Sequence, residues 1–85
     1  MEGNAFAPGQ QLRIINLVLN VRTAPNANEP NVVSVLNFGD FVRVIAGPYP
    51  DPSGRYEWWE VATAQGITGW IAAVIDGRFT VEVVE

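Results

Sequence analysis

The chain has 85 residues, which is enough for one domain with a single core. It contains no cysteine and no histidine, which excludes disulfide bonds and a zinc site built from these two residue types. Nine acidic residues against five arginines, with no lysine, give a net charge of −4, so the cationic surplus that binds nucleic acid or an anionic membrane is missing.

Period-two alternation of apolar and polar residues recurs along the chain, and no window keeps the 3.6-residue period of a helix. We expect residues 1–10 to be a linker or an irregular segment and residues 11–85 to form one domain. The alternation is first clear in the stretch 15–21, whose odd positions are all apolar. This pattern predicts a strand with Leu19 and Val21 on its buried face.

Leu12 and Ile14 break the parity of that strand, so we expect a bulge or a bend near Ile14. Gly66 is available for a positive φ in a hairpin connection, and a short 3₁₀ turn is expected near 72–75. Five or six short antiparallel strands at this spacing predict an all-β fold, either a small barrel or a sandwich. The later strands are expected at 32–36, 41–45, 58–63, 67–72 and 79–83.

Two long loops are predicted between these strands. The first, 24–31, is polar and bounded by prolines, and the second, 46–57, carries three prolines in alternate positions around Tyr49. Proline fixes φ, so a tyrosine held between prolines loses little conformational entropy when it binds a partner. A surface loop whose tyrosine rests on its own barrel is the alternative, and the sequence leaves both open.

Four motifs resemble the bacterial SH3 (Src homology 3-like) domain family. In order they are "LNVRTAP" at 19–25, "VVSVLNFGDFVRV" at 32–44, "WWEV" at 58–61 and "GITGWIA" at 66–72. The resemblance covers 17–75, and four motifs in the family's order make it specific. It implies a small SH3-like β-barrel. The chain departs from the family in its longer, proline-rich second loop and in an extra C-terminal strand.

Several residues of these motifs have structural interpretations. Gly69 is expected where a close neighbour or a bent strand leaves no space for a Cβ atom. Trp70 is large enough to cap one end of a small barrel. Arg22 lies at a strand end near Trp70, where a guanidinium can stack on a ring or bond loop carbonyls, with ligand capture as the alternative. Asn20 is expected to make local turn hydrogen bonds.

Trp58 and Trp59 are adjacent in a predicted strand, so their side chains point to opposite faces. If Trp59 packs inward as a structural residue, Trp58 stands exposed or half-exposed near the two long loops. An exposed tryptophan is the residue type that most often anchors a bound partner, so Trp58 is the leading candidate for ligand contact. Tyr49 and Tyr56 are further candidate contact aromatics. A cover for the barrel's own edge is the alternative role of Trp58.

We predict no catalytic site, no metal site and no cofactor. Without histidine, cysteine or lysine, the usual pairs of nucleophile and base cannot be assembled. Glu57 and Glu60 differ in parity, so we expect them on opposite sides of one strand rather than paired across a cleft as in a glycosidase. The glycines form no phosphate-cradling loop ahead of a helix.

The resemblance implies a non-catalytic binding module of a larger bacterial surface or cell-wall-associated protein, with peptide or peptidoglycan as its ligand. Asp51 and Glu29 are candidate contacts for an amine or a basic partner. The implied location is extracytoplasmic, although we recognise no signal peptide in this segment. We expect neither a nucleic-acid partner nor membrane insertion.

A second hypothesis belongs to another class: a structural or interaction domain that packs on neighbouring domains or self-associates, without a free ligand. The apolar strand near 79–84 motivates it, because an uncovered edge strand invites pairing with another chain. The oligomeric state stays open, with a monomer preferred.

Overall fold

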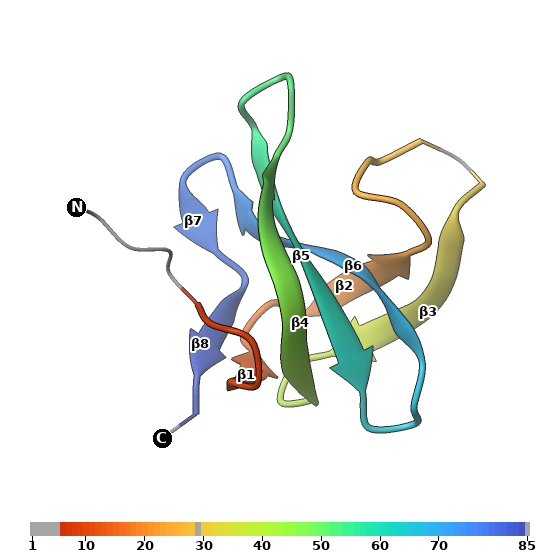
Figure 1. Cartoon of the computed structure of the whole chain (residues 1–85), viewed down its shortest axis with the longest axis vertical. Coiled ribbons are helices and arrows are strands. Elements are labelled where there is room, and N and C mark those ends of the chain that lie inside the picture. Colours follow the sequence, from red (N-terminus) through yellow and green to blue (C-terminus); the bar gives the residue numbers. More distant parts are fainter. Residues whose placement is uncertain (1–5, 29, 85) are drawn as a thin grey trace.

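A computed structural model describes residues 6–28 and 30–84, which form a curled antiparallel sheet (Figure 1). The predicted all-β barrel is confirmed, with eight strands in the described part of the chain, because β1 is added to the expected set and the strand expected at 79–83 is divided into two short ones. No helix within these residues has the length and apolar character needed to cross a membrane. The strands are β1 (Gln11–Ile14), β2 (Val18–Arg22), β3 (Val32–Asn37), β4 (Phe41–Pro50), β5 (Tyr56–Thr63), β6 (Thr68–Ile75), β7 (Arg78–Phe79) and β8 (Val81–Val83).

The strand order across the sheet is β3-β2-β6-β5-β4-β1-β8, and β7 pairs with β6. Since β7 pairs with β6 and β8 pairs with β1, the C-terminal segment links two distant strands of the sheet. Between β7 and β8, the Thr80 hydroxyl donates to the Ala72 carbonyl at 2.7 Å. The apolar strand near 79–84 is therefore part of the barrel wall. Val81 is buried in the core, where it is 2% exposed, and β8 is the last strand of the order and pairs with β1 alone, so the self-association hypothesis stays a prediction.

Residues near both ends of the chain contribute to the core, since Phe6 and Val81 both belong to the buried cluster. Leu19 and Val21 are buried, as the alternation predicts. The bend expected near Ile14 is confirmed and is larger than a bulge, because it separates β1 from β2 and leaves Leu17 82% exposed. The buried cluster comprises Phe6, Leu12, Ile14, Leu19, Val21, Leu36, Val42, Val44, Trp59, Val61, Ile71, Ala73 and Val81.

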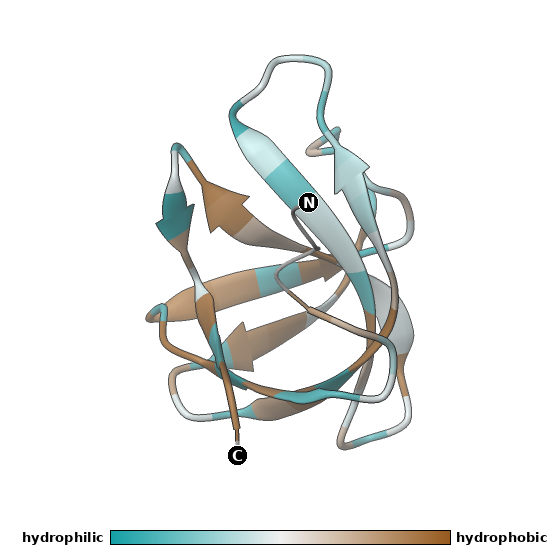
Figure 2. Ribbon diagram, turned by 60° about the vertical axis from the view of Figure 1, so that its left-hand side comes forward, coloured by the Kyte–Doolittle hydropathy of each residue, from teal (hydrophilic) through white to brown (hydrophobic). Residues whose placement is uncertain are grey.

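The second long loop is much shorter than predicted. β4 runs to Pro50 and β5 begins at Tyr56, so the connection is 51–55, the polar end of the hairpin seen at the top of Figure 2. Strand structure tolerates these prolines because β4 pairs with β1 only near its start and its register with β5 shifts on both sides of Ala46. The prediction of a loop over 46–57 was wrong for this reason.

The 3₁₀ turn expected near 72–75 is also absent from the described residues, because this stretch is the end of β6. Its backbone pairs with β5 on one side and with β7 on the other, so the extra C-terminal segment keeps it extended. The sequence analysis did not predict an extended backbone here, because β7, whose pairing keeps the end of β6 extended, comes later in the chain.

Two glycines have the roles that the sequence suggests. A Cβ atom on Gly69 would lie 2.6 Å from Val21 Cγ1 and 2.7 Å from the Arg22 carbonyl oxygen, so only glycine lets β6 approach β2. Gly66 has a φ of +85° in the connection between β5 and β6, as expected of a hairpin glycine.

The N-terminal segment is described from Phe6 onward. Residues 7–10 contain no strand, but the Phe6 ring is buried and lies edge-on to Trp59, with 5.1 Å between ring centroids. The Gly9 N–H donates to the Val44 carbonyl at 2.8 Å, which ties this irregular stretch to β4. The segment 6–10 therefore packs on the barrel.

Candidate functional site

A groove opens where β2 and β6 part. The two strands share a single register pair, Arg22 with Trp70. Beyond that pair lies a hollow of about 190 Å³, which we call the β2–β6 groove. Its lining combines aromatic, aliphatic and polar side chains, among them Asn20, Arg22, Ala27, Tyr56, Trp58 and Ile75.

The β2–β6 groove continues into a second, wider hollow of about 690 Å³. The two hollows share Asn16 and Ile75, and the second adds Asp76, Arg78 and Phe79 to the lining. The first hollow alone is smaller than the 300–1,000 Å³ typical of small-molecule pockets.

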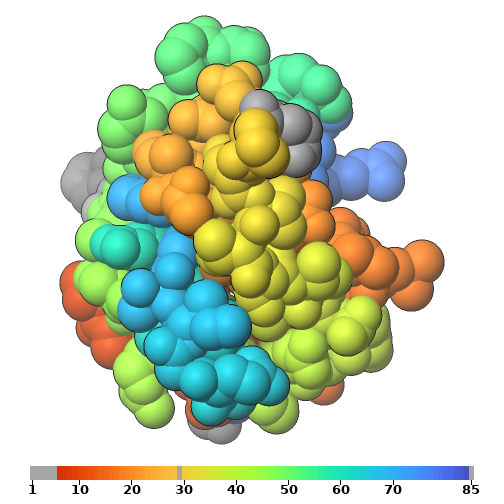
Figure 3. Space-filling view, turned by 90° about the vertical axis from the view of Figure 1, so that its right-hand side faces the viewer, coloured from red at the N-terminus to blue at the C-terminus, as the bar shows by residue number. Residues whose placement is uncertain are grey.

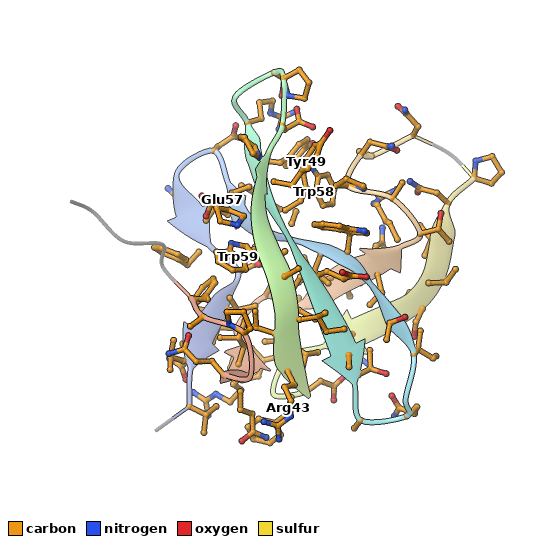
Figure 4. All side chains as sticks on the ribbon, viewed as in Figure 1. Arg43, Tyr49, Glu57, Trp58 and Trp59 are labelled. Atoms are coloured by element: carbon orange, nitrogen blue, oxygen red, sulfur yellow. The ribbon has the colours of Figure 1, made fainter. Side chains whose placement is uncertain are left out.

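Trp58 lies at the floor of the groove and is buried. Trp58 and Trp59 point to opposite sides of β5, as the alternation predicts (Figure 4). Their exposed fractions are nevertheless 1% and 0%, so the expectation of an exposed or half-exposed Trp58 was wrong. The face away from the core is covered as well, because the curled hairpin brings Tyr56 and the 51–55 turn over the Trp58 ring.

Trp58 is fixed by contacts at the hairpin end. Its indole Nε1 donates to Asp51 Oδ1 at 3.2 Å, and its ring lies 5.4 Å from that of Tyr56 between centroids. Asp51 Oδ2 accepts from both the hydroxyl and the backbone N–H of Ser53. The Ser53 hydroxyl, followed by the Trp58 indole, lowers the pKa of Asp51 below its ordinary value of 3.8. An ionised Asp51 thus joins the turn to the groove floor.

Tyr56 is held from outside by residues that the sequence analysis did not single out. The Arg55 guanidinium lies 5.1 Å from the centroid of the Tyr56 ring. Its Nε and Nη2 each donate to an Asp76 carboxylate oxygen at 3.1 Å. This bidentate pair lowers the pKa of Asp76 and raises that of Arg55. No sequence signal could have found a pair that is 21 residues apart and joined only by the fold.

The described residues of the loop 24–31 form another border of the groove and are ordered by asparagine side chains. Arg22 Nη1 donates to Asn31 Oδ1 at 2.8 Å, and Asn31 Nδ2 donates to the Asn26 carbonyl at 3.1 Å. The Thr23 N–H donates to the Asn31 carbonyl at 2.8 Å. Arg22 therefore both supports the loop and lines the groove. Glu29, a predicted contact, lies outside the described residues.

The structure brings some of the predicted residues together and separates others. Asn20, Arg22, Tyr56 and Trp58 meet in the groove. Tyr49 is 48% exposed but does not line it; its ring lies edge-on to the half-buried Trp70, 6.0 Å away between centroids.

In the interior, Trp59 rather than Trp70 fills the core. The Asn20 side chain makes no hydrogen bond among the described residues, so the local turn bonds expected of it are not formed there.

The curled all-β sheet, with a groove between β2 and β6, defines a small barrel-type domain. A family model described as the bacterial SH3 domain matches residues 17–75. This match covers most of the chain, so the chain belongs to the bacterial SH3 domain family, whose members are binding modules and are generally non-catalytic. Searches of curated proteins and of solved structures gave no match.

Proposed function

We propose that this domain binds an extended peptide, of the kind found in peptidoglycan cross-links, in the β2–β6 groove. The observation that carries the proposal is the groove itself: two adjoining hollows that share Asn16 and Ile75 and are lined by aromatic, aliphatic and polar side chains. Rigid aromatic surfaces provide contact area at a low cost in side-chain entropy. The family's role as binding modules supports the same function.

Asn20 is the polar residue best suited to hold a peptide backbone. It is half-buried in the groove, and its side-chain amide has no hydrogen-bond partner among the described residues. An amide offers both a carbonyl acceptor and two N–H donors, which match the acceptor and donor of one peptide unit. We assign Asn20 as the backbone contact, beside the half-buried ring of Tyr56, which the buried Trp58 supports from below.

The roles of the other predicted contacts follow from their positions relative to the groove. Asp51 acts mainly through Trp58, because Ser53 and the indole already bond both of its oxygens. Its ionised carboxylate also adds negative potential near the groove, which suits a ligand carrying an amine. Tyr49 lies beyond the lining, and contacts from Tyr49 and Glu29 remain predictions. We further propose an extracytoplasmic location, where such ligands occur.

The test is titration calorimetry with soluble peptidoglycan fragments and with their isolated stem and cross-link peptides. Asn20→Ala removes one backbone contact of the proposed complex and should weaken binding about tenfold, the value of one hydrogen bond at its upper range. Trp58→Ala is unsuitable, because deleting a buried tryptophan costs about 3–5 kcal/mol of stability.

Asn37→Ala is the matched control, since Asn37 is an exposed strand asparagine outside the groove. It should bind as the unmodified chain does. Equal binding by the Asn20→Ala and Asn37→Ala variants would remove the groove from the site. Failure of the unmodified chain to bind any fragment at millimolar concentration would overturn the proposed ligand class.

A further inference from the structure

The second hollow beside the β2–β6 groove contains an arginine that the described residues do not pair. Each of the other arginines bonds a described group: Arg13 bonds Glu82, Arg22 bonds Asn31, Arg43 bonds the Gly9 carbonyl and Arg55 bonds Asp76. Arg78 lines the hollow of about 690 Å³ and makes no hydrogen bond or ion pair among the described residues. A guanidinium carries five N–H donors and no acceptor, so Arg78 is available to an anionic group of a ligand.

The hairpin turn between β6 and β7 sets the direction of the Arg78 side chain. The turn consists of Asp76 and Gly77, with φ angles of +50° and +81°. A two-residue turn with positive φ at both positions places its flanking residues opposite each other, and Ile75 is indeed paired with Arg78. Ile75 is also paired with Tyr56 of β5, and the register does not shift at these pairs. Directly paired side chains share one face of a sheet, so Arg78 projects on the face of Tyr56 and Ile75, which line the groove.

The positive charge of Arg78 is not cancelled by the acid that lies next to it. Asp76 also lines the second hollow, but its two carboxylate oxygens each accept from Arg55 at 3.1 Å. Together, these three side chains carry an excess of one positive charge. In Figure 3, violet-blue atoms of this C-terminal part of the chain project at the right-hand edge, beside the green end of the β4–β5 hairpin. Because the whole chain has a net charge of −4, most of its surface repels a ligand carboxylate, whereas this end attracts it.

Asn16 and Phe79 add a second donor and an apolar wall. The Asn16 amide has two N–H groups, and its Nδ2 donates to the Val18 carbonyl at 3.4 Å, which leaves one N–H group for a ligand. Phe79 is 53% exposed, and its ring rests against the buried Phe6 ring, with 6.0 Å between centroids. A charge-assisted hydrogen bond is stronger beside apolar surface than in open water. The hollow thus suits a carboxylate that is attached to an apolar residue.

We propose that the second hollow binds a carboxylate group of the peptide ligand through Arg78 and Asn16. The assignment rests on the proposed peptide binding in the β2–β6 groove and gives the bound peptide a direction, with its carboxylate at the β7 end. The planar guanidinium matches a carboxylate in bidentate geometry, so arginine is selective for this group. Asn16, Arg78 and Phe79 lie outside residues 17–75, which the family model matches, so the selectivity belongs to this chain's own additions to the family domain.

Titration calorimetry with one stem peptide, prepared as the free acid and as the C-terminal amide, tests the assignment. The unmodified chain should bind the free acid about tenfold more tightly, which is the lower range for one hydrogen bond to a charged group. In Arg78→Gln this preference should disappear, whereas Arg78→Lys should retain part of it because the charge remains. An amidated peptide with one internal glutamate distinguishes the two sources of a carboxylate. Recovery of the affinity assigns the bound group to a side chain, and no recovery assigns it to the C-terminus.

Arg43→Gln is the matched control, because it makes the same change in net charge. Arg43 is exposed, lines neither hollow of the groove and lies at the bottom of Figure 4, far from Trp58. This variant should prefer the free acid as strongly as the unmodified chain does. Equal binding of the two peptides by the unmodified chain, or a preference that survives in Arg78→Gln, would overturn the carboxylate site and leave the proposed peptide binding intact.

A small probe decides the question if no peptide binds. N-acetylalanine combines one carboxylate with one peptide unit, and N-acetylalanine amide is its neutral counterpart. In an NMR titration of the arginine Nε–H signals, the acid should cause a saturable shift of the Arg78 signal and the amide should cause none. With all peptides inactive, this shift would keep the carboxylate site and reject the peptide ligand. Its absence would reject both.

Discussion

Asp51 shows how one side chain can set the geometry of a site without lining it. Its carboxylate accepts from Ser53 in its own turn and from the Trp58 indole in the next strand. The turn and the groove floor are thus held by the same charge. Since these hydrogen bonds favour the ionised form, the pKa of Asp51 is lower in the folded chain than its ordinary 3.8.

The lowered pKa predicts a loss of stability in acid. A carboxyl group with a depressed folded-state pKa contributes its full stability above 3.8 and loses it as the pH falls through the lower folded value. Asp51→Asn should therefore melt below the unmodified chain at neutral pH, and this gap should close in strong acid. Thermal melts followed by circular dichroism across this range measure the effect.

Ser53→Ala provides the matched comparison, because it removes the donor that contributes most to the shift of the Asp51 pKa. In that variant the folded-state pKa of Asp51 moves back toward 3.8, so the acid-dependent loss of stability should be smaller and should be complete at a higher pH. A gap between Asp51→Asn and the unmodified chain that stays constant from neutral pH to strong acid would contradict the prediction.

At the scale of elements, the loop 24–31 depends on side-chain hydrogen bonds instead of strand pairing. The Asn31 side chain accepts a hydrogen bond from Arg22 and donates to Asn26. Three side chains thus order the described residues of a loop that lacks regular structure. This loop borders the β2–β6 groove through Ala27. The stability of the loop and the shape of the groove are therefore linked through Arg22.

We predict that the main effect of Arg22→Ala is a lower melting temperature, and that the affinity for the ligand changes less. Loss of the hydrogen bond to Asn31 should cost about 1 kcal/mol, or roughly 4–8 °C in a domain of this size. Asn31→Ala should cost a similar amount, and the double variant should cost less than the sum, because both substitutions remove the same contact. Thermal melts and calorimetry of the same samples separate the two effects.

Asn28→Ala in the same loop is the control, since its side chain is exposed. It should leave the melting temperature unchanged. Unaltered stability of the Arg22→Ala variant would contradict the structural role of Arg22.

On the scale of the whole molecule, the C-terminal segment links distant strands of the sheet. β7 and β8 pair with strands that lie far apart in the strand order, and Thr80 stands between them. Thr80 is 3% exposed, its hydroxyl bonds the Ala72 carbonyl, and its own carbonyl accepts from the Ile15 N–H at 2.9 Å. Thr80 thus connects β6 with the turn that follows β1.

Thr80→Val should destabilise the domain by about 1–3 kcal/mol, because it keeps the side-chain volume but leaves the buried Ala72 carbonyl without its donor. Urea unfolding monitored by tryptophan fluorescence measures this change. Thr68→Val, at an exposed position of β6, should change stability by less than about 0.5 kcal/mol. Equal midpoints for the two variants would show that the hydroxyl of Thr80 contributes nothing.

Features that depend on neighbouring residues in the chain could be predicted. Alternation predicted that Leu19 and Val21 are buried, and the steric argument for Gly69 is confirmed by its distance from Val21. The candidate site was predicted less well. Tyr56 and Trp58 were predicted and do line the groove. Arg55 and Asp76 were missed because they lie in two turns that are 21 residues apart in the sequence and meet only in the fold.

The sequence by itself determined the β-strand pattern, the barrel class and the family, because strand periodicity, turn glycines and ordered motifs are local properties of the chain. Only the tertiary structure decided that Trp58 is buried, that the C-terminal segment links β6 with β1 and that β3 is an edge strand. Alternation assigns a side chain to a face of a strand. What covers that face depends on the curl of the sheet and on residues far away in the sequence.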